Sequence, residues 1–369
     1  MNVRDALRSV HVDTERTWGG GQRQVAWLAA GLARRGHPAW LMARPETGFA
    51  GRLRGSGVEV TALAPAAEWD LIAAARIRAL AERAGAQLVV AHAAHAAALA
   101  AFATVGTGVR LVVTRRVALP LRRSPLSRWK HRRAALVVAV SERVRRALLA
   151  DGVEAERVRV VHSGVELTRP SEPAGEGTLR ALGLDPGRPI AVMVSSLAPP
   201  HKDPVTFLRA VAEARRIRPD LQGLLVGGGA LLGAALRARS ALGLDHAVPI
   251  VGYRDDAERL LAAGAVAVLS SRDEGMGTTL LDAMLWGVPV VATDAGGVRE
   301  IVRDRVDGLL SRPGDGPALG ANLIAVLADA GLRERLVSAA RERVLDFSTD
   351  RMVEGTVDAY RHALYSAPC

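Results

Sequence analysis

The sequence predicts an α/β protein made of two Rossmann-like, doubly wound domains. Short valine-rich segments alternate with amphipathic helical segments along the whole chain, which is typical of parallel sheets covered by helices. Glycine-rich turns follow several of the predicted strands, as in sheets that bind ligands at the carboxyl ends of their strands. At 369 residues the chain is longer than one hydrophobic core usually supports, so two domains are expected.

The composition indicates a folded protein in a reducing compartment. Hydrophobic residues make up 49% of the chain and charged residues 24%, which excludes a disordered protein. The one cysteine, Cys369, excludes a disulfide framework and a thiolate metal site. The first 20 residues lack the apolar core of a signal peptide, and the alanine-rich stretch 91–109 is interrupted by histidine, glycine and threonine. We therefore expect no membrane-spanning helix and a cytoplasmic protein.

The first domain is expected to span residues 1–167. Three glycines precede a helix within residues 18–37 whose apolar positions recur at helical spacing, and Gly36 ends it. A glycine turn at a helix N-terminus is compatible with phosphate binding, although many α/β proteins use such glycines only to make the turn. Further strands are expected within 37–44, 51–63, 86–92, 109–116, 134–141 and 158–164, and further helices within 70–84 and 142–150.

A change in composition marks the boundary between the domains. Residues 168–188 are rich in proline and small residues and are expected to form a linker. The second domain is expected to span 189–345, and a last helical segment, 346–369, is expected to pack back on the first domain. Strands of the second domain are expected within 190–196, 221–229, 248–253, 263–269 and 288–293, and helices within 204–217, 230–242, 279–287 and 318–345.

Residues 269–300 hold the strongest indication of a ligand site. A short valine-rich strand is followed by a polar loop in which Glu274 precedes two glycines and two threonines. We expect Thr278 or Thr279 to cap the next helix, so that its first N–H groups and its dipole face the loop. An anion or a group of hydroxyls suits such a place.

A second acid and a second glycine turn point to the same edge of the sheet. Asp282 lies about one turn inside the helix that Gly287 ends, and residues 294–297 form another glycine-rich turn that opens a helix. A loop acid is usually only solvated, and a turn glycine is usually only structural. Two acids and two glycine turns at the carboxyl ends of neighbouring strands nevertheless favour a ligand site.

One predicted strand of the first domain ends in a histidine. His92 lies at the carboxyl end of the strand 86–92, and His95 follows about one turn later. A histidine in this place serves as a ligand contact or a general base, or it is satisfied by neighbouring backbone groups. The last interpretation is the more common one for a single histidine, and both stay open.

Part of the net charge of +11 is concentrated in one segment without acids, residues 110–141. Its basic residues are Arg110, Arg115, Arg116, Arg122, Arg123, Arg128, Lys130, Arg132 and Arg133. Such a segment lies against anionic lipid head groups or a phosphorylated acceptor, or it is a solvated face of an arginine-rich protein. Nucleic acid is a further interpretation, but no nucleic-acid-binding module accompanies the segment, so no nucleic acid partner is expected.

On these motifs the chain resembles the retaining glycosyltransferases of family 4, which have the GT-B fold of two Rossmann-like domains facing a central cleft. The similarity extends over nearly the whole chain, and its most specific part is SSRDEGMGTTLLDAMLWGVPVVATDAGGVREIV, residues 270–302. The resemblance implies transfer of a sugar from a UDP-, GDP- or ADP-sugar, with retention of anomeric configuration and without a cofactor or an essential metal ion. It implies a glycan or lipid-linked acceptor, as in cell-surface glycan or lipopolysaccharide biosynthesis, and peripheral contact with an anionic membrane through Arg110 to Arg133.

The resemblance also implies the roles of single residues. Glu274 matches the first acid of the family's E-x7-E motif, which contacts the donor-sugar hydroxyls, and Asp282 stands where a glutamate usually contacts the ribose. Lys202 matches the lysine that pairs with the diphosphate, where negative charge grows as the glycosidic bond breaks. The implied donor-binding set is Gly20, Gly21, Ser196, Lys202, Gly228, Arg254, Glu274, Gly275, Met276, Gly277, Thr278 and Asp282. The implied catalytic set is Glu274, Lys202, His92 and Arg116, and no metal ligand is expected.

Two positions depart from the family pattern. The arginine usually found shortly before Lys202 is absent, with Ser195 and Ser196 in its neighbourhood, so Arg254 or another basic group is expected to assist Lys202. Many relatives have a histidine where Arg116 falls, and an arginine cannot act as a base near neutral pH. By hypothesis the histidine's role passes to His92, or Arg116 binds a phosphate-bearing group.

Two other functions remain open on the same residues. One is a nucleotide-sugar 2-epimerase with the GT-B fold, although the additional cleft acids and histidines it needs are not found at matching positions. The other is a protein that binds a nucleotide-sugar or glycan without turnover. A dinucleotide site at residues 226–233 is disfavoured, because its glycines miss the G-x-G-x-x-G spacing by one residue.

Overall fold

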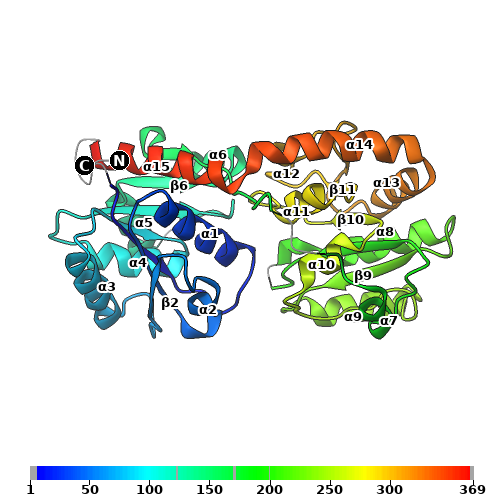
Figure 1. The fold of residues 1–369 in the computed structure, drawn as a ribbon, viewed down its shortest axis with the longest axis horizontal. Helices are drawn as coiled ribbons and strands as arrows, with labels where there is room; N and C mark the ends of the chain where they lie inside the picture. Colours follow the sequence, from blue (N-terminus) through cyan, green and yellow to red (C-terminus); the bar gives the residue numbers. More distant parts are fainter. Residues whose placement is uncertain (1–5, 122–123, 169–171, 199, 366–369) are drawn as a thin grey trace. The chain divides into compact units, whose positions relative to one another are not determined.

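The computed structural model describes residues 6–121, 124–168, 172–198 and 200–365 (Figure 1). The chain divides into two compact units. Unit 1 combines the residues up to Gly164 with those from Thr349 onward, and unit 2 is Val165–Ser348. Each unit is a parallel sheet with helices packed against it, so the predicted class of two Rossmann-like α/β domains is confirmed.

Unit 1 contains a seven-stranded parallel sheet in the order β3-β2-β1-β4-β5-β6-β7. The strands are β1 (Ser9–Asp13), β2 (Ala39–Ala43), β3 (Glu59–Ala62), β4 (Leu88–Ala91), β5 (Arg110–Arg115), β6 (Leu136–Ala139) and β7 (Val158–Val160). The strand order reverses between β1 and β4, where Val12 pairs with Ala91. Ligands of doubly wound sheets bind at such a reversal, outside the carboxyl ends of the strands.

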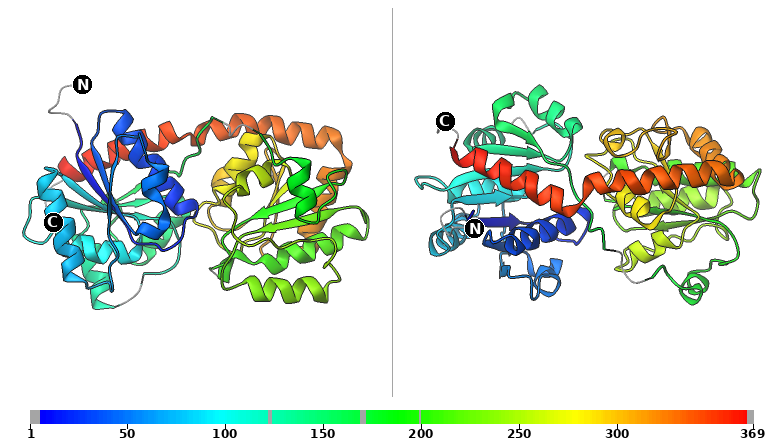
Figure 2. Two further views of the ribbon diagram at one scale, coloured as in Figure 1. Left: turned by 60° about the horizontal axis from the view of Figure 1, so that its bottom comes forward. Right: turned by 45° about the horizontal axis from the view of Figure 1, so that its top comes forward.

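Most helices of unit 1 pack through apolar faces. The helices are α1 (Gly20–Arg34), α2 (Phe49–Arg52), α3 (Leu71–Arg83), α4 (Ala94–Ala103), α5 (Pro125–Arg133), α6 (Glu142–Ala150) and α15 (Thr349–Tyr365). The buried side chains of α5 are instead Ser127, Lys130 and His131. Helices α1 and α15 lie side by side (Figure 2) and share one core with the sheet, in which Leu28 and Leu32 of α1 meet Val353 and Tyr360 of α15. The last helix is therefore part of unit 1, although the rest of that unit ends near Gly164.

Unit 2 contains a five-stranded parallel sheet in the order β12-β11-β10-β8-β9. The strands are β8 (Ile190–Val194), β9 (Gln222–Val226), β10 (Val266–Leu269), β11 (Val290–Thr293) and β12 (Leu309–Ser311). The helices are α7 (Glu176–Ala181), α8 (Pro204–Arg215), α9 (Leu232–Ala241), α10 (Ala257–Ala262), α11 (Thr279–Trp286), α12 (Val298–Ile301), α13 (Gly316–Ala328) and α14 (Ala330–Arg343). The order reverses between β8 and β10, which places the β8 and β10 loops at the position where ligands are expected.

Three segments differ from the sequence-based expectations. The described part of 168–188 is folded into unit 2, because Leu179 and Leu184 are buried and the Gln222 amide group bonds to the backbone of Asp185. The helical run expected over 318–345 is interrupted at Asp329, whose extended backbone lets its carboxylate cap α14. Residues 248–253 touch β9 only through isolated bridges and do not form a full strand.

The turn after β9 fixes the shape of the loop after β8. Gly227 has φ +144°, and a Cβ atom built there would lie 1.8 Å from the carbonyl oxygen of Ser195. The backbones also exchange hydrogen bonds, from Ser195 N to Val226 O at 3.0 Å and from Leu197 N to Gly228 O at 3.0 Å. Gly227 therefore serves the close approach of two backbones of the protein.

We predict that Gly227→Ala lowers the stability of unit 2 by about 3 kcal/mol or more, because alanine adds both a backbone clash and a strained φ. Gly177→Ala is the matched control, since a Cβ built at Gly177, in α7, meets no atom within 4 Å. In a helix this second change is expected to be neutral or to stabilise by up to about 1 kcal/mol. Urea unfolding followed by tryptophan fluorescence compares the two variants, and equal midpoints would contradict the prediction.

Candidate functional site

The loop after β10 places a buried carboxylate against a lysine. The Glu274 side chain is 6% exposed, and its Oε1 accepts hydrogen bonds from Lys202 Nζ at 2.6 Å and from Ser271 Oγ at 2.6 Å. Its other oxygen, Oε2, accepts no hydrogen bond from another described residue. Two donors on Oε1 fix the orientation of the carboxylate and leave Oε2 as the oxygen for a ligand hydroxyl.

A strained aspartate holds the lysine in place. Asp203, directly after Lys202, has left-handed backbone angles of φ 41° and ψ 60°, which cost a non-glycine residue about 1–2 kcal/mol. Its carboxylate offsets this cost by accepting bonds from Thr206 N, from Thr206 Oγ1 at 2.7 Å and from Arg272 Nε at 2.8 Å. Its carbonyl accepts a bond from Ser270 Oγ at 2.8 Å, which ties the Lys202 turn to the end of β10.

The second glycine turn, residues 294–297, packs against the backbone of Glu274. Gly297 N donates to the Glu274 carbonyl oxygen at 2.9 Å. A Cβ atom built on Gly296, which has φ +59°, would lie 2.4 Å from that oxygen and 2.4 Å from Asp273 Oδ1. Only glycine allows this approach, so the turn 294–297 fixes the backbone that carries Glu274.

The start of α11 differs in one respect from the expectation. Thr278 occupies the N-cap position, but its side chain makes no capping hydrogen bond, because its backbone is already helical, with φ −59° and ψ −21°. Gly275 and Met276 are buried, with Met276 only 3% exposed, and Gly277 adopts φ +85°. Gly277 therefore lies in the left-handed region, which glycine adopts without strain.

The remaining residues predicted for the donor site occupy different environments. Asp282 lies in the first turn of α11 and is 4% exposed, Ser196 is exposed, and the Gly228 carbonyl oxygen accepts the Leu197 N–H. Two of the three guanidinium nitrogens of Arg254 donate to Asp256, at 2.7 and 2.8 Å, so Arg254 is paired with a carboxylate in this structure, as Lys202 and Arg272 are.

Sequence reasoning missed Arg272 and His201, which lie beside Lys202. Arg272 is paired with Asp203, is 60% exposed, and its backbone N–H donates to the His201 carbonyl oxygen at 2.7 Å. Partial burial, together with the charge of Lys202, lowers the pKa of His201, so its ring is neutral at neutral pH. Arg272 is thus a basic group in the loop after β10 that is bonded to the Lys202 turn. The absence of an arginine before Lys202 gave reason to look for such a group.

Unit 1 gathers a second set of polar side chains at the ends of β1, β4 and β5. Helix α1 begins at Gly20, so Gly20 and Gly21 lie in its first turn and not in a preceding loop. A Cβ atom built on Gly21 would lie 3.7 Å from Arg116 Cδ, which places Arg116 against this helix start. Burial lowers the pKa of Arg116 to about 10, and its buried Nε has no hydrogen-bond partner among the described residues.

Asp13, which ends β1, is a further member of this set. Its Oδ1 accepts a bond from Glu15 N at 2.9 Å, and its Oδ2 accepts one from Gln22 Nε2 at 3.3 Å. Burial raises the pKa of Asp13, and the Glu15 N–H, Gln22 and Arg116 partly counteract this effect. The carboxylate therefore lies close enough to Arg116 to act on its charge.

His92 is buried and bonded to a second histidine. Its Nε2 lies 2.9 Å from His11 Nδ1, and the two ring planes are nearly parallel, 7° apart, with centroids 5.2 Å apart. Burial is the main cause that lowers the pKa of His92 well below its ordinary value, and His11 and Arg116 add to it. His95, one turn later, is half-buried. Sequence reasoning missed His11 and Asp13, although polar residues alternating with valine in a buried strand are a signal that finds them.

The basic segment is less exposed than expected. Lys130 is buried, donates to Ala94 O at 2.6 Å and pairs with Glu68, while Arg133 and Arg115 donate to backbone carbonyls. Long basic side chains reach the unpaired carbonyls of helix ends and loops, which explains the burial of Lys130. Arg128, Arg132 and Arg133 are exposed, whereas Arg122 and Arg123 lie outside the described residues.

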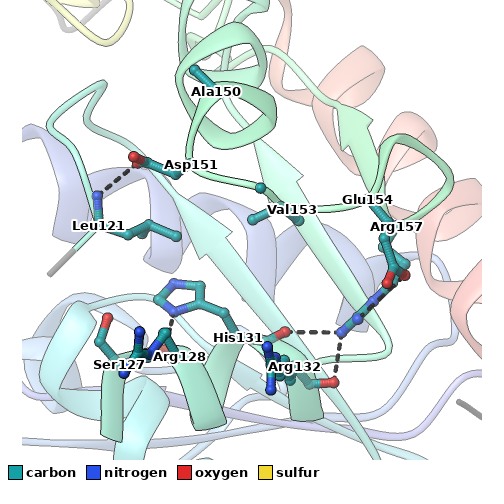
Figure 3. Close-up of a pocket in the computed structure, with 11 residues that line it drawn as sticks. Leu121, Ser127, Arg128, His131, Arg132, Ala150, Asp151, Val153, Glu154 and Arg157 are labelled. Atoms are coloured by element: carbon teal, nitrogen blue, oxygen red, sulfur yellow. Dashed lines mark hydrogen bonds and ion pairs between the residues drawn. The ribbon is translucent and has the colours of Figure 1, made fainter. Parts of the chain in front are cut away.

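Arg128 and Arg132 line a pocket of about 420 Å³ between α5 and the end of α6 (Figure 3). On its far side the Arg157 guanidinium donates to the carbonyl oxygens of His131 at 2.8 Å and Arg132 at 2.7 Å, closing the end of α5. Asp151 and Glu154 also line the pocket. Its walls therefore carry both signs of charge.

Two kinds of feature are absent from the residues that the structure describes. No helix within residues 6–121, 124–168, 172–198 and 200–365 combines the length and apolar character needed to cross a membrane. In the same part of the chain, no three His, Cys, Asp or Glu side chains are grouped so that they could share a metal ion.

Comparison with known proteins identifies the family. The family described as "Glycosyl transferases group 1" matches residues 188–329, and "Glycosyltransferase Family 4" matches residues 18–169. A D-inositol 3-phosphate glycosyltransferase of Salinispora arenicola is 33% identical over 226 residues, which cover 56% of this chain and 50% of the relative. An α-maltose-1-phosphate synthase of Mycobacterium tuberculosis is 31% identical over 264 residues, 64% of this chain and 66% of the relative.

A solved structure agrees with these sequence matches. The Anabaena protein HepE, in complex with UDP and glucose, superposes with a TM-score of 0.83 at 22% identity, covering 96% of this chain and 99% of that one. Likeness at this identity establishes the fold, which is GT-B. The match to the Salinispora relative spans about half of that protein's length. With one family description on each half and a GT-B fold throughout, the chain belongs to the family 4 (group 1) glycosyltransferases.

Proposed function

We propose that the chain transfers a sugar from a nucleoside-diphosphate donor to a hydroxyl acceptor with retention of anomeric configuration. The observation that supports this most is the pair of Lys202 Nζ and Glu274 Oε1, 2.6 Å apart at the point where the strand order of unit 2 reverses. A cation for the diphosphate and a carboxylate for sugar hydroxyls are the two groups that a nucleotide-sugar site needs side by side. HepE, solved with UDP and glucose, has the same fold.

In the proposed reaction Lys202 acts on the leaving group. The bond between the anomeric carbon and the diphosphate oxygen breaks, and negative charge grows on the diphosphate. Lys202 is held ready by Asp203 and can stabilise this charge without reorganisation, which is worth about 10²–10³-fold in rate for one preorganised group. Arg272, in the loop after β10 and paired with Asp203, is the further basic group that we assign to the diphosphate.

Glu274 and Asp282 are assigned to the donor's hydroxyls. Glu274 Oε2 accepts bonds from the sugar, while Lys202 and Ser271 keep Oε1 in place. Asp282, on α11, is assigned to the ribose, with the backbone of Gly275, Met276 and Gly277 facing the sugar and phosphates. The acceptor oxygen bonds to the anomeric carbon on the face that the diphosphate leaves, and its proton passes to the leaving phosphate oxygen. No protein nucleophile and no metal ion is needed in this scheme.

Unit 1 is assigned to the acceptor side of the reaction. Gly20 and Gly21 open α1, and Arg116 and His92 lie at the neighbouring strand ends, where a hydroxyl or phosphate of a ligand finds donors. The acceptor is proposed to be a glycan or lipid-linked molecule of cell-surface biosynthesis. The protein is placed in the cytoplasm, with peripheral contact to an anionic membrane surface through the exposed arginines of α5.

A panel of UDP-, GDP- and ADP-sugars, supplied first alone and then with lipid-linked or polysaccharide-type acceptors, tests the proposed reaction. Transfer predicts release of nucleoside diphosphate that depends on an acceptor, with a product of unchanged anomeric configuration. Interconverted donor sugar without an acceptor would instead indicate a 2-epimerase. Tight binding without any product would indicate a binding protein.

We predict that Glu274→Ala reduces transfer by at least about 10²-fold, because the donor sugar loses its carboxylate and Lys202 loses its fixed partner. Glu176→Ala is the matched control, since Glu176 is exposed and pairs only with Arg180 on the surface of α7. Steady-state kinetics of both variants, with circular dichroism as a check of folding, measure the effect. A folded and fully active Glu274→Ala protein would refute the site assignment.

We predict that replacing both Arg128 and Arg132 with glutamine weakens binding to anionic vesicles by about 30-fold, given about 1 kcal/mol per basic residue near such a surface. Neither guanidinium is paired with another described residue, so both charges are available. The control replaces Arg180 and Arg216, exposed arginines of unit 2, and removes the same net charge. Co-sedimentation that is equal for both double variants would contradict membrane contact through α5.

A further inference from the structure

A chain of three buried polar side chains crosses the sheet of unit 1 at the reversal of strand order. His11 Nε2 lies 3.0 Å from Ser9 Oγ, and His11 Nδ1 lies 2.9 Å from His92 Nε2. Ser9 and His11 are 1% and 0% exposed, and His92 is 6% exposed. Ser9 and His11 share one face of β1, and His11 pairs with Val90, so His92, two residues after Val90, reaches the same face.

The far end of this chain is unsatisfied. His92 Nδ1 is buried and has no hydrogen-bond partner among the described residues. The charged and titratable groups that act on His92 are His11 on β1 and Arg116 after β5. Asp13 on β1 and Tyr360 on α15 act in turn on Arg116, and the Tyr360 ring lies beside His11. Burial holds both histidines neutral at neutral pH, so each ring carries one proton on one of its two nitrogens.

Two arrangements of hydrogens fit the two contacts. In the first, the Ser9 hydroxyl donates to His11 Nε2, and His11 Nδ1–H donates to His92 Nε2. The proton of His92 then lies on Nδ1. In the second, His92 Nε2–H donates to His11 Nδ1, and His11 Nε2–H donates to Ser9 Oγ. His92 Nδ1 then carries no proton, and the Ser9 hydroxyl hydrogen has no acceptor.

The count of unsatisfied groups decides between the two. The first arrangement leaves one group unsatisfied, the Nδ1–H of His92 at the carboxyl edge of the sheet. The second leaves two, the His92 lone pair and the Ser9 hydroxyl hydrogen. Ser9 begins β1 and its hydroxyl makes no other hydrogen bond with a described residue, so no ligand at the carboxyl edge can satisfy it. A buried donor without an acceptor is costly, which favours the first arrangement.

We infer that Ser9 and His11 are positioning residues that fix His92 as the Nδ1–H tautomer, so that His92 offers a hydrogen-bond donor, and not a general base, to an oxygen of the bound ligand. The part of this inference that concerns a ligand rests on the proposed transferase function. The tautomer itself does not depend on any substrate. Because a protonated Nδ1 cannot accept a proton, the inference also assigns the acceptor's proton to the leaving phosphate and not to His92.

Nitrogen-15 NMR of the full-length, histidine-labelled protein reads the tautomers directly, because protonated and bare ring nitrogens differ strongly in chemical shift. Two histidines of the same unit serve as internal references. His37 Nδ1 accepts the Leu7 N–H and must be the Nε2–H form, whereas His131 Nδ1 donates to Ser127 O and must be the Nδ1–H form. We expect His11 and His92 to match His131, and a match of either to His37 would overturn the inference.

Ser9→Ala removes the hydroxyl hydrogen that sets the direction of the chain. We expect His11 and His92 to shift towards the Nε2–H form, which predominates in free histidine, while His37 and His131 stay unchanged. Persistence of the Nδ1–H form in this variant would show that Ser9 does not control the tautomer. If the variant fails to fold, the spectrum of the unaltered protein still decides the tautomer of His92.

Kinetics test the role of His92 with the donor and acceptor that the nucleotide-sugar panel identifies. Asparagine places an amide donor near the position of Nδ1, whereas aspartate places only acceptors there. We expect His92→Asn to retain at least tenfold more kcat than His92→Asp, with no loss of rate on acidification that follows a histidine pKa. A His92→Asp protein at least as active as His92→Asn would overturn the donor role. Failure of the proposed function would instead show as no transfer by the unaltered protein, with the tautomers unaffected.

Discussion

The pairing of Lys202 with Glu274 is the interaction on which the functional part of unit 2 depends. A carboxylate that is 6% exposed is unfavourable unless it is paired and hydrogen-bonded, and here one oxygen receives both Lys202 and Ser271. Such a pair contributes little to stability in itself. The pair places a positive and a negative charge side by side. A ligand that carries both a diphosphate and hydroxyls can then bind Lys202 through the diphosphate and Glu274 through the hydroxyls.

The backbone around this pair is shaped to keep it in place. Asp203 has a left-handed backbone conformation, and Thr206, Arg272 and Ser270 bond to it. These bonds tie the turn that carries Lys202 to the end of β10. The backbone of Gly296 approaches the backbone of Glu274 so closely that a side chain at position 296 would prevent the contact. These features put local strain next to the ligand site and offset it with hydrogen bonds, as binding sites commonly do. The rigid part of the site is therefore the scaffold that carries the two charges.

Much of this arrangement follows from the sequence, and the rest depends on contacts between distant residues. The two α/β domains, the loop of Glu274 and the helix of Asp282 could be predicted because they rest on local patterns of strand, glycine turn and helix. Arg254 is assigned to the diphosphate from its position in the chain, and the sequence does not show that it pairs with Asp256, two residues away. The cap expected from Thr278 fails because its backbone is already helical. His11 meets His92, 81 residues away, only because β1 and β4 are neighbours, and strand order is not a local property.

The division of roles between Lys202 and Glu274 is tested most directly by calorimetric binding of a nucleoside diphosphate and of the matching nucleotide-sugar to two variants. If Lys202 binds the diphosphate and Glu274 binds the sugar, Lys202→Met weakens both ligands by a similar factor. Glu274→Gln then weakens the nucleotide-sugar and leaves the affinity for the nucleoside diphosphate nearly unchanged. Equal losses for both ligands in Glu274→Gln, or unchanged diphosphate affinity in Lys202→Met, would contradict the account.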